Sequence, residues 1–139
     1  MPVAKVFIDT NVWVYAHLRG ADDARHAVAL ARVEGEAGAI ISPQVVAEYY
    51  SVMLRNGRAD VWIQSNLRAI FARTRLQPAN AVVLNATLAL RNRYGFSFWD
   101  CQIAAAALVA GCTILLTEDL QHGQLLDERL RVVNPFSGG

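Results

Sequence analysis

The segment Val6-Phe7-Ile8-Asp9-Thr10-Asn11 decides the fold predicted for this chain. Its first three residues are apolar and β-branched or aromatic, which is typical of a short buried strand, and Asp9 can cap a helix that follows. The segment Ala39-Ile40-Ile41 has the same form, because Ser42-Pro43 then supplies a cap and a first helical residue. Strands that alternate with helices predict an α/β sandwich with a mainly parallel sheet.

Apolar periodicity and capping residues divide the rest of the chain into further strands and helices. In the helix predicted at 23–33, we expect Ala27, Leu30 and Ala31 to share one face. The predicted strands lie at 5–8, 39–41, 74–76, 113–116 and 132–133, the predicted helices follow Asp9, Ser42, Asp60, Asn80 and Ser97 and span 23–33, and 118–124 is a loop.

Length and composition predict one domain that spans residues 1–139. The hydrophobic fraction of 54% exceeds the ~45–50% usual for soluble domains, which indicates a buried parallel sheet or a subunit interface. The longest nearly apolar run, 103–116, is shorter than the ~18–20 residues that span a bilayer. No signal peptide precedes the first strand, so we expect a cytoplasmic protein in which Cys101 and Cys112 are reduced core residues.

Four acidic residues lie beside the predicted apolar elements, and they are Asp9, Glu48, Asp100 and Asp119. Active sites of parallel sheets gather at the carboxyl ends of strands, where Asp9 and Asp119 are expected. Glu48 and Asp100 occupy early turns of helices that begin at the same edge. If the four converge, their repulsion requires a hard divalent cation such as Mg²⁺. The sequence therefore predicts metal-assisted chemistry on a phosphate substrate.

Each acid also has a structural interpretation. Asp9 can simply cap the helix after it, and Asp100 matches the acidic position of a capping box. Glu48 is harder to explain in this way, because its neighbours at helical spacing indicate a partly buried face on which an unpaired Glu is costly. Asp119 competes with Glu118, and Asp119 is preferred because it directly precedes a leucine whose burial would fix its geometry.

The net charge of +1 hides an asymmetry. Between Tyr49 and Trp99 the chain has seven arginines and one acid, Asp60. A basic surface beside an acidic centre suits a phosphodiester backbone that must reach a metal, although solvated helix faces explain any single arginine equally well. The arginines that we expect to bind substrate are Arg73, Arg75, Arg91 and Arg93.

Other polar and aromatic residues have weaker functional interpretations. His122 is a candidate phosphate contact in a loop near Asp119, but a lone loop histidine more often faces solvent. We expect His17 and His26 at the surface. The spacing of Trp62 and Phe71 indicates a hydrophobic face that packs in the core or at an interface.

Four segments together resemble the PIN domain, and the match looks closest to the VapC-type toxins of bacterial toxin–antitoxin pairs. They are 6–11, 42–48, 96–100 and 116–123, and the likeness extends to 133–136. The resemblance implies a three-layer α/β/α PIN-like domain with a mainly parallel central sheet. It also implies a Mg²⁺- or Mn²⁺-dependent ribonuclease that forms a homodimer and binds a small antitoxin, whose tail blocks the acidic pocket.

The resemblance also assigns roles to residues. Trp99 stands where many relatives carry a smaller or different residue. Glu48 would hold a metal-bound water or a second ion. The acids that match the family's metal cluster are Asp9, Glu48, Asp100 and Asp119, of which Asp9, Asp100 and Asp119 are the expected ligands, and the supporting polar positions are Thr10, Asn11 and Thr117.

These observations predict in-line hydrolysis of an RNA phosphodiester bond, in which metal polarises the phosphate and lowers the pKa of a bound water. One alternative is a non-catalytic module that binds RNA or protein, whose binding should survive chelation. Another is a phosphatase of the haloacid-dehalogenase type with Asp9 as nucleophile. That class uses a second Asp where this chain has Asn11, and it needs a lysine in the sheet region, whereas Lys5 is the only lysine.

Overall fold

The structure of the chain is a computed structural model that describes residues 4–19 and 23–137. The strands of these residues form one sheet in the order β3-β2-β1-β4-β6-β5, in which β5 alone runs antiparallel to its neighbour. The strands are β1 (Val6–Ile8), β2 (Ala39–Ile41), β3 (Thr74–Leu76), β4 (Ile114–Leu116), β5 (Leu125–Leu126) and β6 (Leu130–Val133).

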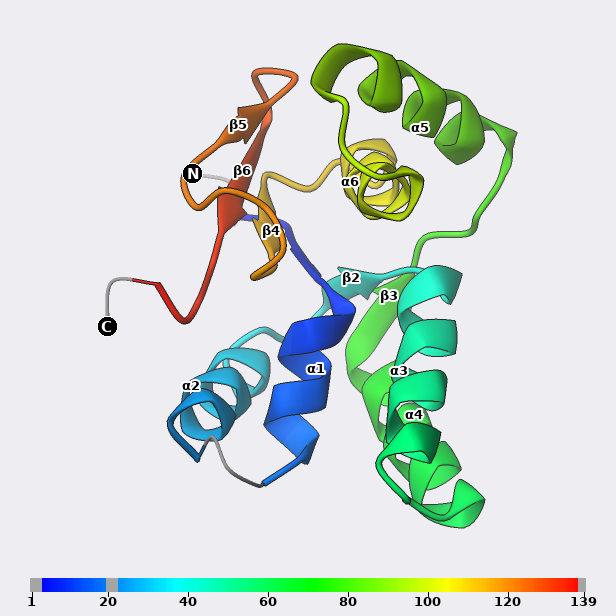
Figure 1. The fold of residues 1–139 in the computed structure, drawn as a ribbon, viewed down its shortest axis with the longest axis vertical. Helices are drawn as coiled ribbons and strands as arrows, with labels where there is room; N and C mark the ends of the chain where they lie inside the picture. The colour runs from blue at the N-terminus through cyan, green and yellow to red at the C-terminus, as the bar shows by residue number, and fades with distance from the viewer. Residues whose placement is uncertain (1–3, 20–22, 138–139) are drawn as a thin grey trace.

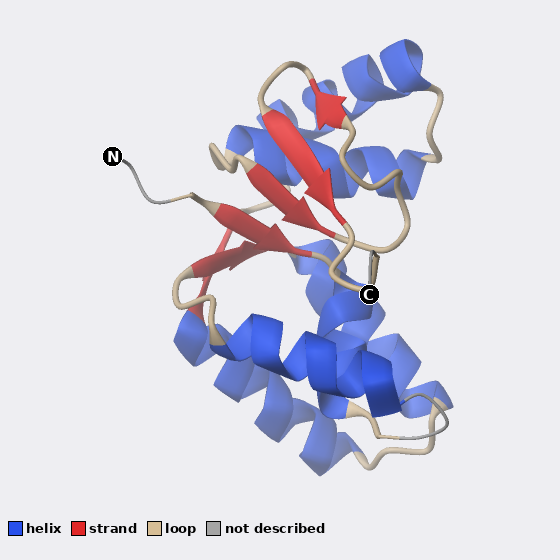
Figure 2. Ribbon diagram, turned by 90° about the vertical axis from the view of Figure 1, so that its left-hand side faces the viewer, coloured by secondary structure: helices blue, strands red, loops and turns tan. Residues whose placement is uncertain are grey.

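Helices cover both faces of this sheet. Helices α1 to α4 lie on one side and α5 and α6 on the other (Figures 1 and 2), so the predicted mainly parallel α/β architecture is confirmed. The helices are α1 (Thr10–His17), α2 (Asp23–Glu34), α3 (Pro43–Arg55), α4 (Asp60–Arg73), α5 (Ala81–Tyr94) and α6 (Phe98–Val109).

The core lies on the two faces of the central strands. β1 and β2 are buried along their whole lengths, as expected of parallel strands covered on both faces. On α6 the small residues Ala104 to Ala107 are all buried, so the helix can lie close to the elements beneath it. Free Cys101 and Cys112 are buried as well, as the sequence predicted.

The carboxyl ends of β1 and β4 lie side by side. Ile8 is in register with Leu116, and the backbone N–H of Asp9 donates to the carbonyl of Leu116 at 3.0 Å. The polar residues that follow each strand are therefore neighbours, although more than 100 positions separate them in the chain. This edge positions the candidate site.

Two local predictions need correction. The hairpin strand β5, which pairs with β6, was not predicted. The expected face of α2 is wrong in part, because Ala27 and Ala31 are exposed and the buried residues are Ala29 and Val33. In the described residues, no helix is long and apolar enough to cross a membrane.

Candidate active site

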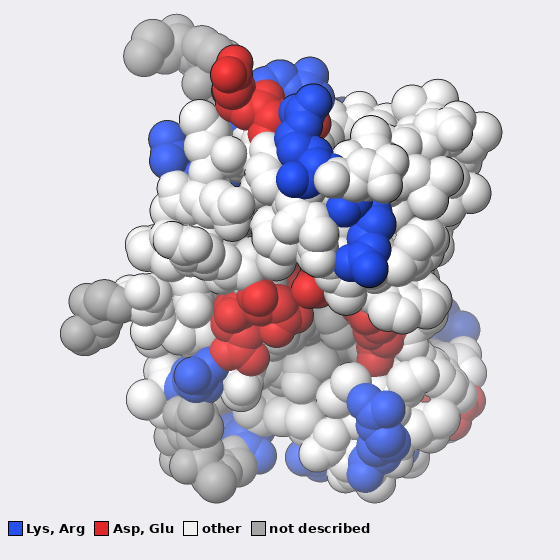
Figure 3. Space-filling model, turned by 45° about the horizontal axis from the view of Figure 1, so that its top comes forward, with Lys and Arg blue, Asp and Glu red and all other residues white. Residues whose placement is uncertain are grey.

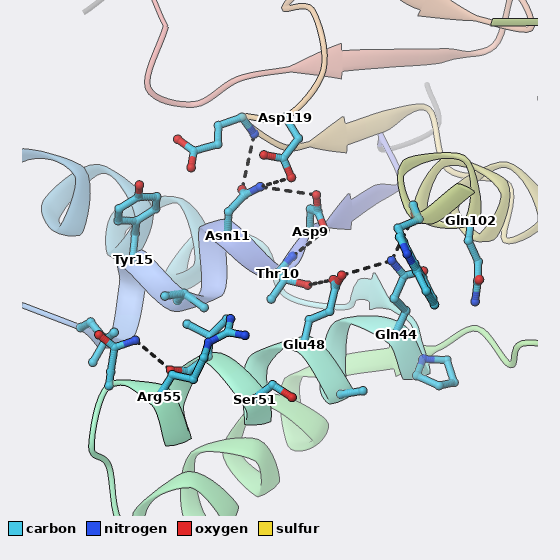
Figure 4. A pocket seen from close by; sticks show the side chains of 18 of the residues that line it. Asp9, Thr10, Asn11, Tyr15, Gln44, Glu48, Ser51, Arg55, Gln102 and Asp119 are labelled. Carbon is cyan, nitrogen blue, oxygen red and sulfur yellow. Dashed lines mark hydrogen bonds between the residues drawn. The ribbon is translucent and has the colours of Figure 1, made fainter. Parts of the chain in front are cut away.

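A pocket of about 1120 Å³ opens at the carboxyl edge of the sheet, between α1, α3 and the loop after β4 (Figure 4). Figure 3 shows acidic side chains gathered around a hollow in one face, with basic side chains on either side. The acids that line the pocket are Asp9, Glu48, Glu118 and Asp119.

Asp9 is the most deeply buried of these acids. It caps α1, because its Oδ1 accepts from the backbone N–H of Thr10 at 2.7 Å, and its Oδ2 accepts from Thr117 Oγ1 at 2.8 Å. Burial, followed by the charges of Asp119 and Glu48, nevertheless raises the pKa of Asp9 to about 7. The two hydrogen bonds oppose this rise. Capping therefore explains only part of the environment of Asp9.

The Asn11 side chain joins the acids from the two strands (Figure 4). Its Nδ2 lies 3.1 Å from Asp119 Oδ2, 3.3 Å from Thr117 Oγ1 and 3.5 Å from Asp9 Oδ2. Its Oδ1 accepts from the backbone N–H of Glu118 at 3.4 Å. Oxygens of two carboxylates thus face one weakly positive amide group.

Glu48 reaches the pocket from α3 and is half-buried. Thr10 Oγ1 donates to its Oε1 at 2.7 Å, and Gln44 Nε2 donates to its Oε2 at 3.3 Å. The same Gln44 nitrogen donates to the carbonyl of Trp99 at 3.2 Å, so it ties α3 to the start of α6. These hydrogen bonds, from both sides, fix the direction of the Glu48 carboxylate.

Asp100 lies next to the pocket but is not among the residues that line it. Its backbone N–H donates to Ser97 Oγ at 3.1 Å, which confirms the predicted cap of α6. Burial raises the pKa of Asp119, and among the neighbouring charges that of Asp100 raises it most. Asp100 is therefore electrostatically part of the acid cluster.

The structure separates Glu118 from Asp119. Glu118 forms an ion pair with Arg25, whose guanidinium lies over the rings of Tyr15 and Phe136. Asp119 instead accepts from the neutral amide of Asn11. The geometry therefore favours Asp119 as the acid whose charge faces Asp9.

Burial is the largest cause of the raised pKa values of Asp9 and Asp119, and repulsion between the neighbouring acids raises both further. Across residues 4–19 and 23–137, no group of three or more Asp, Glu, His or Cys side chains is close enough to enclose a metal ion. Mg²⁺ rarely uses such a cage, because it is usually bound by one or two carboxylates, several waters and substrate phosphates. The donor set fits a cation of that kind.

The four arginines expected to bind substrate do not line this pocket. Arg73 donates to the carbonyls of Val33 and Glu34 at 3.0 and 2.9 Å, and Arg91 donates to the carbonyls of Gly95 and Phe96. These bonds join neighbouring elements or close a helix end.

The other two arginines also have their contacts outside the acidic pocket. Arg93 forms an ion pair with Asp127 at 2.6 Å. Arg75 lines a separate, smaller pocket beside Lys5. The positive charge that the sequence placed between Tyr49 and Trp99 is thus spread over several surfaces.

Two arginines that the sequence interpretation did not single out line the acidic pocket, namely Arg19 and Arg55. Arg55 could have been found, because it lies seven positions after Glu48 and eleven after Gln44, on the same face of one helix. No comparable signal marks Arg19, which follows α1 and donates to His26 at 3.3 Å.

The histidines and exposed aromatics are placed as follows. His17 is not at the surface as predicted: it is half-buried, and its Nδ1 lies 2.6 Å from the hydroxyl of buried Tyr49. His26 is also half-buried. His122 Nδ1 accepts from the backbone of Asn134, and Phe71 is 49% exposed.

The mainly parallel sheet and the acid-lined pocket at its carboxyl edge define a domain of the PIN-like class. The sequence profile of the PIN domain matches residues 6–125, and the chain therefore belongs to the PIN-domain family.

Solved structures of toxin–antitoxin proteins share this fold. VapC20 of Mycobacterium tuberculosis, described as a sarcin–ricin loop cleaving toxin, is 20% identical, with a TM-score of 0.66 over 83% of this chain and 92% of that one. A toxin–antitoxin complex from Klebsiella pneumoniae is 17% identical, with a TM-score of 0.70 over 96% and 98%. VapBC2 from Rickettsia felis, bound to promoter DNA, is 19% identical, with a TM-score of 0.66 over 93% and 98%. No curated protein sequence matches the chain significantly.

Proposed function

We propose that this chain is a divalent-metal-dependent endoribonuclease and the toxin of a toxin–antitoxin pair. The observation that carries the proposal is the convergence of Asp9, Glu48 and Asp119 in one pocket of a PIN domain that Arg19 and Arg55 also line. Carboxylates attract a divalent cation and arginines attract phosphates, so the pocket combines what phosphodiester hydrolysis requires.

Asp9 and Asp119, assisted by Asp100, would hold Mg²⁺ or Mn²⁺. The bound metal would polarise the phosphate and make a coordinated water more acidic. Thr117 and Asn11 orient the two carboxylates, and their hydrogen bonds are already formed. Residues that orient metal ligands in this way typically change metal affinity or activity 10- to 100-fold when they are replaced.

Glu48 would position the attacking water. Thr10 and Gln44 hold its two carboxylate oxygens at 2.7 and 3.3 Å, so the side chain need not reorganise when substrate binds. In the reaction the water oxygen forms a bond to phosphorus as the bond to the leaving ribose oxygen breaks. We expect Glu48 to accept the proton that the water releases.

Arg19 and Arg55 would bind phosphates of the RNA strand near the scissile bond. We expect replacement of both by Ala to weaken RNA binding and to lower the slope of log affinity against log salt by ~0.7 for each lost contact with a single strand. Titrations at several salt concentrations measure this slope. The predicted pairs Arg73 with Arg75 and Arg91 with Arg93 serve as comparison variants in the same assay. An unchanged slope for Arg19 and Arg55, with a lower slope for either other pair, would move the RNA path to that surface.

The toxin assignment is supported by the fold shared with VapC20 and with two toxin–antitoxin complexes. A small antitoxin protein is the proposed partner, and the cytoplasm is the proposed location, where RNA is available. We also propose a homodimer, because α5 exposes a row of apolar residues that a second copy can cover. The residues of this row are Leu84 and Leu88, which lie one helical turn apart.

A structural observation weakens the phosphatase alternative. Lys5 precedes β1 and donates to the carbonyl of Ala110 at 2.5 Å, whereas Asp9 follows the opposite end of the same strand. Lys5 therefore cannot steady a phosphate carried by Asp9. The binding-module alternative predicts that RNA binding without any cleavage is the whole activity.

Sequencing the 5′ ends of cellular RNAs after induction tests the proposed function. Wild-type protein should produce new 5′ ends at discrete positions within minutes, and Asp9→Asn protein at the same level should produce none. A set of ends identical to that of the uninduced culture would leave the binding module as the better assignment.

A further inference from the structure

The acidic pocket has a second end that none of the roles above explains. In Figure 4, Arg55 and Gln102 lie at opposite ends, and Glu48 and Gln44 lie between them. At the Gln102 end, α6 contributes Trp99 to the pocket lining. This end of the pocket is aromatic and uncharged, in contrast to the arginine end.

Trp99 is unusually exposed for so large an apolar side chain. Its exposed fraction is 61%, and that of Phe98 beside it is 39%. The two rings meet edge to face, with centroids 5.6 Å apart and planes at 89°, so Phe98 contacts the indole while more than half of the Trp99 side chain stays exposed. An exposed aromatic in a groove marks a place where a ligand can cover it.

The position of Trp99 is fixed relative to the acids. Gln44 Nε2 donates both to the carbonyl of Trp99 and to the carboxylate of Glu48. Trp99 also directly precedes Asp100 in the first turn of α6. The backbone that carries the indole is therefore anchored beside Glu48.

Gln102 lies three residues after Trp99 and lines the same pocket. No hydrogen bond of its side chain is present among the described residues. A primary amide offers both a donor and an acceptor, which is what reading the edge of a nucleobase requires.

We propose that Trp99 and Gln102 form a nucleobase subsite, in which the base next to the scissile phosphate stacks on the Trp99 indole and the Gln102 amide contacts its edge. The proposal rests on the proposed function, because it requires an RNA strand in the pocket. A single-stranded or looped nucleotide is the ligand that fits, since its planar base can stack on the indole while its phosphate reaches the metal that the neighbouring acids would hold.

Binding of a single-stranded RNA oligonucleotide to the Asp9→Asn protein provides the first test, because the RNA should remain uncut. Adding Trp99→Ala should weaken affinity about 5- to 150-fold, the range for loss of one base-stacking contact. Trp99→Phe should restore most of the affinity, since a stacking ring remains. Phe71→Ala is the matched control, because it removes an aromatic on α4 that is 49% exposed but does not line the pocket.

Tryptophan fluorescence identifies the ring that contacts RNA. RNA should quench emission in the Asp9→Asn protein, and the quenching should disappear when Trp99→Phe is added. Trp13 is buried and Trp62 is half-buried beneath Arg58, so neither should respond. Titration of Mg²⁺ into the Trp99→Ala protein should match wild type, which shows that Asp100 is undisturbed.

Cleavage-site sequencing with Trp99→Ala and Gln102→Ala in the otherwise wild-type protein provides the second test. Both variants should lose base preference at a position adjacent to the cut, whereas Phe71→Ala should keep it. Unchanged affinity, quenching and cleavage pattern would refute the subsite while leaving the nuclease intact. Loss of antitoxin binding or dimerisation without any change towards RNA would show that Trp99 contacts protein instead. If wild-type protein neither binds nor cuts RNA, the proposed function itself fails.

Discussion

Asp9→Asn should abolish RNA cleavage and at the same time stabilise the metal-free protein. The substitution keeps the shape of the side chain but removes the charge at the centre of the acid cluster. We expect cleavage to fall by at least about 100-fold, because replacing even a residue that only orients a metal ligand costs 10- to 100-fold. Mg²⁺ affinity, measured by calorimetric titration, should fall as well. Unchanged Mg²⁺ affinity would remove Asp9 from the metal site.

The stabilising half of this prediction has a defined pH dependence. The pKa of Asp9 is about 7 in the folded state and 3.8 when unperturbed, so the folded protein binds the proton more tightly. Protonated Asp9 therefore contributes to the stability of the metal-free protein. This contribution should be complete below about pH 4 and should be lost as pH rises towards 7. The upper limit of this loss is roughly 4 kcal/mol, at ~1.4 kcal/mol per pKa unit.

Thermal melts in the presence of a chelator measure this effect. Between pH 5 and 8, the melting temperature of wild-type protein should fall more steeply than that of Asp9→Asn. Some slope should remain in the variant, because burial also raises the pKa of Asp119. Glu118→Gln is the control, since its carboxylate is paired with Arg25 and its loss should not stabilise the protein. Parallel pH curves for wild type and Asp9→Asn would contradict the burial of a charged Asp9.

The fold was largely predictable, and the exception has a physical cause. Local sequence features predict strands such as Val6–Ile8 and capped helices such as Phe98–Val109. These features are a run of apolar residues in the strand and the capping residue before the helix. The hairpin strand β5 has only two residues and exists because it pairs with β6. Its turn places Asp127 and Glu128 at positive φ values of 49° and 58°, where Gly or Asn would have been the recognisable signal.

The acids of the site were more predictable than its arginines. Asp9 and Asp119 follow strands, so the rule for parallel sheets places them at one edge without knowledge of any side chain. An arginine has a long side chain, and its direction depends on partners that are distant in sequence. Arg93 pairs with Asp127, and Arg73 binds the carbonyl of Val33, 40 positions away. A count of charges in a segment cannot predict such partners.

Cleavage should require Mg²⁺ or Mn²⁺, stop when a chelator is added, and be poorly supported by Ca²⁺, whose looser coordination positions water and phosphate less strictly. Asp100→Asn should abolish cleavage as removal of the metal does, yet leave RNA binding within a few-fold. The reason is that arginines rather than acids supply most of the attraction for phosphate. Cleavage that persists in excess chelator would exclude the metal mechanism altogether.

The stability of Asp100→Asn distinguishes a role at the metal from a role in the helix cap. The cap of α6 uses the backbone N–H of Asp100 and the hydroxyl of Ser97, so neither partner is lost in the variant. We therefore expect a stability loss of ~1 kcal/mol or less in urea unfolding. Asp60→Asn is the matched control, because Asp60 opens α4 outside the pocket lining and accepts hydrogen bonds from Tyr50 on α3 and Gln64 on α4, so its loss should leave cleavage unchanged. A folded Asp100→Asn protein that cuts RNA at the wild-type rate would show that Asp100 serves only the local structure of α6 and that Asp9 and Asp119 suffice for the metal.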